Sequence, residues 1–251
     1  MKYVLANWKM YPTVGEAVAL FRGIQNGLGV RVGRGRSVPM PIICPPFLAL
    51  VPIRALMDER LVRLGAQNCH WEQKGPYTGE ISAAMLRDVV DYVLVGHSER
   101  RGVGETDEHV AKKVSAVVEA GLVPIVFVGE DSPTGQGIRQ SEERLRHRLS
   151  RVDLADTTVL VVYEPVWAIG AEQPAQAERV REVAAHLKET LRRLGAVRPE
   201  VLYGGTVRRD NVERFAALEV LDGVGATRGS LDAEEFLDIL SQVAGTSPGT
   251  P

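Results

Sequence analysis

The sequence predicts a single-domain α/β protein, a closed (β/α)8 barrel, and three observations support this fold. Short β-branched runs alternate with longer amphipathic runs along the whole chain. Eight such pairs in 251 residues give a repeat of about 31 residues, the size of a βα unit. No linker rich in Pro, Gly or Ser divides the chain. Strict alternation predicts a parallel sheet, and eight units of this length favour a closed barrel over residues 1–244, followed by a frayed tail at 245–251.

The predicted strands are mostly apolar throughout, as expected for parallel strands that are covered on both faces. They are Lys2–Trp8, Val38–Cys44, Leu61–Ala66, Tyr92–Val95, Val123–Val128, Thr158–Tyr163, Val201–Tyr203 and Leu221–Ala226.

Capping signals mark several of the predicted helices. The first helix opens with a capping box made by Thr13 and Glu16. A later apolar stripe ends at Gly121, and another begins at Pro174 and ends at Gly195. Each signal stands between two predicted strands, as the alternating pattern requires.

Composition excludes several classes of protein. Hydrophobic residues make up 45% and charged residues 25% of the chain, which is ordinary globular composition. The net charge of -2 gives no reason to expect nucleic-acid or membrane binding, and the basic run at Arg31, Arg34 and Arg36 has no interleaved aromatic residues and reads as a solvated connection. No stretch reaches the roughly 20 apolar residues of a membrane helix. The two cysteines, Cys44 and Cys69, fit a reducing compartment, so we expect a cytoplasmic protein.

Polar residues gather just after the predicted strands, where barrels of this kind carry their catalytic groups. Asn7 and Lys9 follow the first strand, His97 and Glu99 the fourth, and Glu164 the sixth. Glycine-rich turns follow the seventh and eighth strands and favour phosphate through free backbone N–H groups. A carboxylate, an imidazole and an ammonium group beside a phosphate site suit proton abstraction next to a carbonyl.

Six segments resemble motifs of the triosephosphate isomerase family, in that family's order and across almost the whole chain. They are Asn7-Trp8-Lys9-Met10, Gly65-Ala66-Gln67-Asn68, Tyr77-Thr78-Gly79-Glu80-Ile81-Ser82, Gly96-His97-Ser98-Glu99-Arg100-Arg101, Tyr163-Glu164-Pro165-Val166-Trp167-Ala168-Ile169-Gly170 and Tyr203-Gly204-Gly205.

The resemblance implies a TIM barrel that interconverts dihydroxyacetone phosphate and D-glyceraldehyde 3-phosphate, in glycolysis and gluconeogenesis, without a metal or an organic cofactor. It implies that Glu164 is the base and that His97 is a neutral electrophile that polarises the carbonyl. It implies that Lys9 supplies positive charge, that Asn7 orients it, and that Glu99 supports the site from below.

The resemblance also implies a lid, a phosphate site and a dimer. Residues 165–171 would close over the substrate and exclude water. The N–H groups of Gly170, Thr206 and the last βα loop, Thr227-Arg228, would hold the phosphate of a small phosphorylated sugar. The segment Cys69–Gly79 would insert into a neighbouring subunit of a homodimer, and its aromatic residues favour an interface.

Four departures from the family pattern lie close to the expected site. Thr227-Arg228 stands where the family usually has two glycines, and a β-branched Thr disfavours φ > 0. Arg228 either grips the phosphate or fills the pocket. The hinge at 171–174 is shorter than usual, the segment 102–105 is one residue short, and Phe127 replaces a usual cysteine. These departures leave open a related isomerase of another small ketose phosphate, such as a four-carbon one, or a barrel that binds phosphorylated ligands without turnover.

Overall fold

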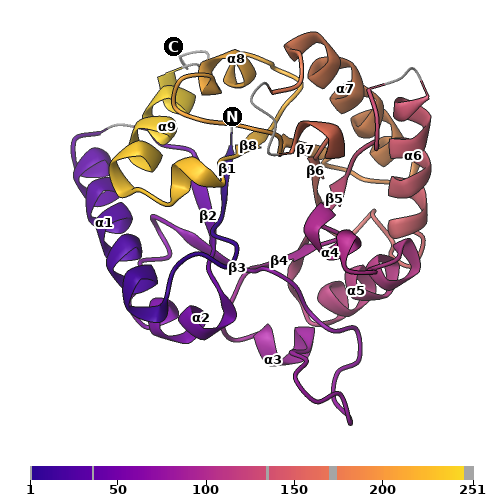
Figure 1. Cartoon of the computed structure of the whole chain (residues 1–251), viewed down its shortest axis with the longest axis horizontal. Helices are drawn as coiled ribbons and strands as arrows, with labels where there is room; N and C mark the ends of the chain where they lie inside the picture. Colours follow the sequence, from indigo (N-terminus) through magenta and orange to yellow (C-terminus); the bar gives the residue numbers. More distant parts are fainter. Residues whose placement is uncertain (1, 36, 134–135, 170–173, 246–251) are drawn as a thin grey trace.

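The computed structural model describes residues 2–35, 37–133, 136–169 and 174–245. Within these ranges eight strands form a ring inside a ring of helices (Figure 1). The strands pair in parallel in sequence order, and β1 also pairs with β8, so the predicted (β/α)8 barrel is confirmed. The strands are β1 Tyr3–Asn7, β2 Met40–Cys44, β3 Arg63–Ala66, β4 Tyr92–Val95, β5 Val123–Val128, β6 Leu160–Tyr163, β7 Glu200–Tyr203 and β8 Gly223–Gly225.

The helices occupy the segments between these strands. The α-helices are α1 Val14–Gly33, α2 Phe47–Arg54, α3 Ala83–Leu86, α4 Ser98–Gly102, α5 Asp107–Glu119, α6 Gly137–Arg148, α7 Ala177–Arg193, α8 Val212–Ala216 and α9 Ala233–Gly245, and the 3-10 turns are η1 Val166–Ala168 and η2 Arg228–Ser230.

The capping signals read from the sequence are confirmed at three helix ends. Thr13 and Glu16 form the reciprocal hydrogen bonds of a capping box at the start of α1. Gly121 and Gly195 follow α5 and α7 with φ of 76° and 96°, a conformation that glycine adopts at little cost. The predicted start of α7 at Pro174 is wrong, because the backbone is still extended at Gln176 and the helix begins at Ala177.

The first helix extends into the basic run that was expected to be a solvated connection. Arg31 was expected in a solvated connection, but α1 continues to Gly33 and the Arg31 side chain donates to Ser241 on α9. A Cβ atom at Gly27 would lie 2.3 Å from a methyl carbon of Leu237. Gly27 therefore permits the close packing of α1 against α9.

Apolar side chains form two layers of core, one between the strands and the helices and one inside the barrel. The inner layer includes Cys44, Ile125 and Phe127. Both cysteines are free thiols and are buried. Among the described helices, none combines the length and apolar character that a membrane crossing requires.

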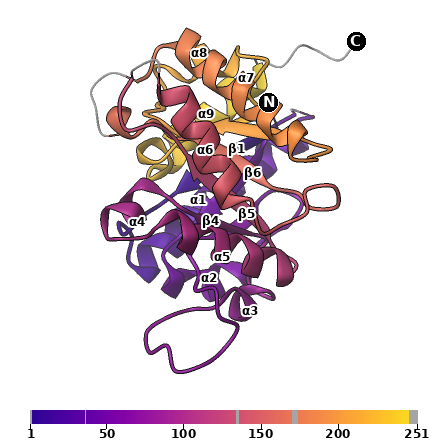
Figure 2. The same cartoon turned by 90° about the vertical axis from the view of Figure 1, so that its right-hand side faces the viewer.

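The segment between β3 and α3 projects away from the barrel in both views (Figures 1 and 2). It contains Cys69–Gly79, the segment expected to contact a second subunit. Near the C-terminus, Gly245 was expected in the frayed tail but still belongs to α9. Residues 246–251 of the expected tail lie outside the described residues.

Candidate active site

Lys9 is placed by a strained backbone just past β1. Its φ is 49°, and no other described residue except glycine has a positive φ. Such a conformation persists only where the surroundings hold it. The Lys9 N–H donates to Asn7 Oδ1 at 3.0 Å, and Gln67 Nε2 donates to the Lys9 carbonyl at 2.8 Å. These two contacts fix the lysine where its side chain lines a cavity at the carboxyl ends of the strands.

His97 begins α4 directly after the end of β4. Gly96 turns the chain with φ of 75°, and a Cβ atom there would lie 3.1 Å from Val110. His97 Nδ1 accepts from the Glu99 backbone N–H at 3.2 Å, so this nitrogen carries no proton. In the neutral ring the proton is then on Nε2, which lies 3.1 Å from Glu164 Oε1. The imidazole is thereby oriented as a hydrogen-bond donor toward the carboxylate.

Glu164 follows β6 directly and is 5% exposed. Its Oε1 contacts His97, and its Oε2 accepts from the Ser98 backbone N–H at 3.1 Å. The loop after β5 crosses its backbone so closely that a Cβ atom at Gly129 would lie 1.9 Å from the Glu164 carbonyl oxygen. A nearly buried carboxylate with this orientation is a suitable base for a proton on a ligand in the adjoining cavity.

The cavity that Lys9 and Glu164 line has a volume of about 210 Å³ and opens at the carboxyl ends of the strands. Its wall includes several of the predicted residues together with others that the sequence reasoning did not select. The lining residues are Lys9, Tyr11, Glu99, Glu164, Ile169, Gly204, Gly205, Thr206, Val207, Arg208, Thr227 and Arg228.

The predicted site residues are thus mostly brought together, with two differences in detail. Asn7 and His97 lie behind the wall, where they contact Lys9 and Glu164. Glu99 was expected to lie below the site, but its side chain is 56% exposed and lies in the wall, with Oε1 2.7 Å from Lys9 Nζ. Gly170 lies outside the described residues.

The last βα loop adopts an ordinary conformation despite its departure from the family pattern. Thr227 has φ of -74°, so its β-branched side chain imposes no left-handed strain. Its carbonyl accepts from Ser230 Oγ at 2.7 Å, which closes the turn η2. Arg228 is exposed and lines the cavity without filling it.

The described part of the lid, residues 165–169, is anchored by Glu130, which is fully buried. The Tyr163 hydroxyl donates to Glu130 Oε1 at 2.8 Å, and Trp167 Nε1 donates to the same oxygen at 3.4 Å. Burial, together with the Glu130 carboxylate, raises the pKa of Tyr163 above its usual range, so the hydroxyl keeps the proton that it donates. Glu130 was not selected from the sequence, although it stands two residues after β5 and the same strand-end rule would have found it.

Two further contacts hold the segments on either side of the undescribed residues. Thr206 Oγ1 donates to the Ala168 carbonyl at 3.0 Å, and the Ala175 N–H donates to the Tyr203 hydroxyl at 3.1 Å. The end of β7 and the loop after it therefore contact the chain on both sides of residues 170–173. No sequence pattern indicated the role of Tyr203, because the contact joins residues 28 positions apart.

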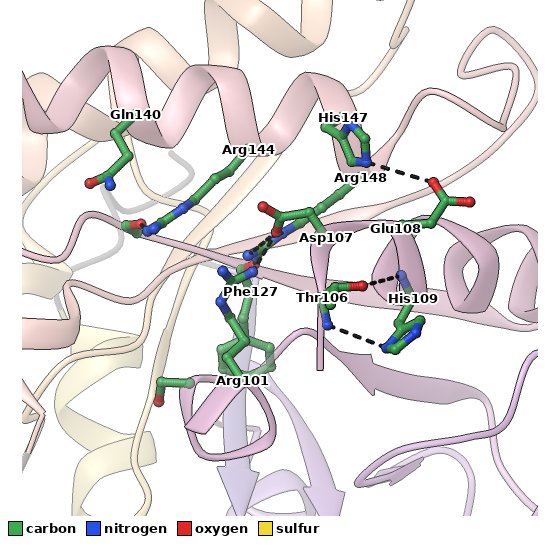
Figure 3. A network of polar contacts seen from close by, with 12 residues as sticks. Arg101, Thr106, Asp107, Glu108, His109, Phe127, Gln140, Arg144, His147 and Arg148 are labelled. Atoms are coloured by element: carbon green, nitrogen blue, oxygen red, sulfur yellow. Dashed lines mark hydrogen bonds and ion pairs between the residues drawn. The ribbon is translucent and has the colours of Figure 1, made fainter. Parts of the chain in front are cut away.

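A network of charged side chains supports the β4–β5 side of the site (Figure 3). Arg148 on α6 is 1% exposed, donates to the Phe127 carbonyl, and has its Nη2 2.7 Å from Asp107 Oδ1. Burial, despite the neighbouring Asp107, lowers the pKa of Arg148 to about 10. The network ties the end of β5 to α5 and α6, and the Phe127 ring in turn lies edge-on to His97, with centroids 4.8 Å apart.

Within the described ranges, no group of three or more His, Cys, Asp or Glu side chains is arranged to hold a metal ion. The arrangement instead offers a base, a ring N–H, an ammonium group and two guanidinium groups around one cavity. Such a set can move a proton on an anionic substrate that carries a carbonyl.

Comparisons with known proteins agree with this geometry. The family model for triosephosphate isomerase matches residues 2–243. The triosephosphate isomerase of Dehalococcoides mccartyi is 36% identical over 249 residues, which cover 96% of each chain. That of Trichodesmium erythraeum is 39% identical over 240 residues, covering 93% of this chain and 95% of the relative.

A solved structure gives the same result for the fold. The crystal structure of triosephosphate isomerase from Bartonella henselae superposes with a TM-score of 0.84 at 32% identity, covering 96% of this chain and 98% of the other. The family expected from the sequence motifs is therefore confirmed. This chain belongs to the triosephosphate isomerase family, and the family and its relatives' names indicate an aldose–ketose isomerase.

Proposed function

We propose that this protein interconverts dihydroxyacetone phosphate and D-glyceraldehyde 3-phosphate, the step shared by glycolysis and gluconeogenesis. The observation that carries the proposal is the contact between Glu164 Oε1 and His97 Nε2 at 3.1 Å, in the wall of a cavity that Lys9 also lines. Family membership supports the same reaction.

The proposed mechanism assigns one task to each group. The Glu164 carboxylate removes a proton from the carbon next to the substrate carbonyl and returns it to the neighbouring carbon. The His97 Nε2–H and the Lys9 ammonium group stabilise the negative charge that develops on the enediolate oxygen. The Asn7 side chain accepts a hydrogen bond from the Lys9 backbone N–H and so orients the lysine, and Glu99 holds the Lys9 ammonium group at the cavity wall.

The phosphate of the substrate would lie at the β7–β8 side of the cavity. Thr206, Thr227 and Arg228 line this side and offer backbone N–H groups and a guanidinium group. Gly170, also expected here, lies outside the described residues. Thr206 additionally anchors the lid through Ala168, so phosphate binding and lid position would share one residue.

The experiment that tests the reaction is a coupled assay in both directions, with Glu164→Gln as the variant and Glu143→Gln, an exposed carboxylate on α6, as the matched control. Loss of the base is expected to lower kcat by about 10²–10⁴-fold, with the control close to the wild type. A folded wild-type protein that converts neither triose phosphate would contradict the proposal.

A four-carbon ketose phosphate is the second candidate substrate, because the side chains of Thr227 and Arg228 stand in the cavity wall. The same assay with a four-carbon ketose phosphate decides between the two. A larger kcat/KM for the four-carbon compound would replace the triose reaction as the main activity.

We also propose that the protein acts as a homodimer in the cytoplasm. Exposed apolar side chains follow β1, β2 and β3, which are neighbours in the barrel, and Met10 and Leu48 are 95% and 81% exposed. Tyr77 on the projecting segment Cys69–Gly79 is also exposed. The two free, buried thiols suit a reducing compartment. Sedimentation that finds only monomer at micromolar protein would contradict the dimer.

A further inference from the structure

Two arginines in the cavity wall have no partner within the described part of the chain. Arg208 follows β7 and Arg228 follows β8, and these strands are neighbours in the barrel. The backbone N–H of Arg208 donates to Asn211, but neither guanidinium group forms a hydrogen bond or an ion pair with a described residue. The adjacent Arg209, by contrast, lies outside the wall and has its Nη1 3.4 Å from Asp238.

The charges in the wall are unevenly matched. Lys9 pairs with Glu99, and the Glu164 carboxylate accepts from Ser98 N–H and faces His97 Nε2. Glu99 and Glu164, the two carboxylates of the wall, therefore already have partners, and they lie on the β1, β4 and β6 side of the cavity. The positive charges of Arg208 and Arg228 remain without a counter-charge on the β7–β8 side. That side of the cavity attracts an anion.

Guanidinium groups suit one class of anion in particular. Their planar array of N–H donors matches the oxygen geometry of phosphate and can bind it in bidentate fashion. Arg208 is half-buried and Arg228 is exposed, so one donor set lies within the cavity and the other at its mouth. Two such groups on neighbouring loops can contact different oxygens of the same phosphate.

We infer that Arg208 and Arg228 form a two-guanidinium clamp for the phosphate dianion of the substrate. The inference rests on the proposed function and adds Arg208, together with side-chain gripping, to its phosphate site. The clamp contacts a part of the substrate that does not react, and an enzyme can use binding energy of this kind in KM, in kcat or in both. Its loss therefore lowers kcat/KM for the phosphorylated substrate. It also binds inorganic phosphate in the absence of any sugar.

The test compares Arg208→Gln, Arg228→Gln and the double variant with Arg209→Gln as the matched control. Steady-state kinetics give KM and kcat for D-glyceraldehyde 3-phosphate, and calorimetry gives the dissociation constant of inorganic phosphate. Each single variant is expected to lower kcat/KM and to raise the phosphate dissociation constant, each by about tenfold, the size of a lost charge-assisted hydrogen bond. The control is expected to stay within about twofold of the wild type.

Two further measurements separate the clamp from a merely structural role. Raising the salt concentration should shrink the difference between the wild type and the double variant, because exposed charges are screened. The kcat/KM for unphosphorylated D-glyceraldehyde should be the same in both. Arg228→Lys keeps the charge without the bidentate geometry and should restore only part of the affinity.

The outcomes distinguish this inference from the proposed reaction. If the wild type isomerises the triose phosphate but the double variant matches the Arg209→Gln control in kcat/KM and phosphate binding, the clamp is wrong. A fall in kcat/KM with unchanged phosphate binding would also overturn it. If the wild type fails to isomerise any triose phosphate while phosphate binding depends on both arginines, the reaction is wrong and the clamp stands.

Discussion

Arginines gather on two sides of the cavity, and their surroundings differ. Behind β4 and β5, Arg148 is buried, and its guanidinium contacts Asp107 and the Phe127 carbonyl. At β7 and β8, the guanidinium groups of Arg208 and Arg228 form no hydrogen bond or ion pair with a described residue, and both line the cavity. A buried charge without partners would be costly, so the first group is matched inside the protein. The second group remains available for a ligand.

The comparison separates residues that hold the barrel from residues that hold the substrate. Changes in the first group should lower the free energy of unfolding, and changes in the second should alter binding while the fold stays intact. Each variant below tests this separation on one side of the cavity.

The largest difference is expected between Arg148→Met and Arg208→Met. The first change leaves the Phe127 carbonyl without its donor and removes the positive charge that pairs with Asp107. The free energy of unfolding should therefore fall by about 3 kcal/mol. The second should change it by less than about 0.5 kcal/mol. Urea unfolding at a single protein concentration measures both. Equal losses in the two variants would contradict the separation.

Substitution of Asp107 should lower the free energy of unfolding by a smaller amount, and that amount should depend on pH. Burial alone would raise its pKa, but Arg148 and Arg101 outweigh that effect and lower it. The stabilisation from ionised Asp107 is therefore present above the unfolded pKa of about 3.9 and is lost as the pH falls through the lower folded pKa.

Asp107→Asn should accordingly cost about 2 kcal/mol at neutral pH, less than for a fully buried pair because Asp107 is about a third exposed. In unfolding curves from pH 7 to pH 2, the difference between the wild type and the variant should begin to shrink below about pH 4 and should vanish only below the lowered folded pKa of Asp107. Asp131 is an exposed carboxylate that pairs with Arg144, so Asp131→Asn is the matched control and should lower the free energy of unfolding by less. A constant difference across the pH range would contradict the assignment.

The smallest effect is expected at Thr206, on the ligand side. Thr206→Val removes the hydrogen bond to the Ala168 carbonyl and keeps the side-chain shape, which should lower kcat/KM by about fivefold, equivalent to about 1 kcal/mol. The free energy of unfolding should barely change. Thr206→Ser retains the hydroxyl and should restore the activity. A stability loss as large as that of Asp107→Asn would place Thr206 with the supporting residues instead.

The fold was predictable because each βα unit repeats the same local pattern. Strand positions followed from apolar runs, and helix ends followed from Thr13 and from Gly121. The exceptions have physical causes in packing. Arg31 was expected in a solvated connection, but α1 continues through it and packs against α9 at Gly27, and a contact of this kind is not visible in local sequence.

The reactive groups of the site were predictable for a different reason. Lys9, His97 and Glu164 each follow a strand, and the carboxyl ends of parallel strands in a barrel meet at one mouth. Their supporting contacts could not be predicted, since they join distant segments. The donation from Gln67 to the Lys9 carbonyl spans 58 positions, and a left-handed lysine has no sequence signature.

The two buried cysteines make the chain convenient for chemical labelling. Burial raises the pKa of the Cys69 thiol to about 12 and that of Cys44 still further above its usual value, so both stay protonated and unreactive toward thiol reagents at neutral pH. A cysteine introduced at an exposed position outside the proposed dimer interface, such as Val197, which is 77% exposed, would then be the only thiol that a maleimide dye modifies readily. A single fluorophore can thus be attached at that position without first removing a native residue.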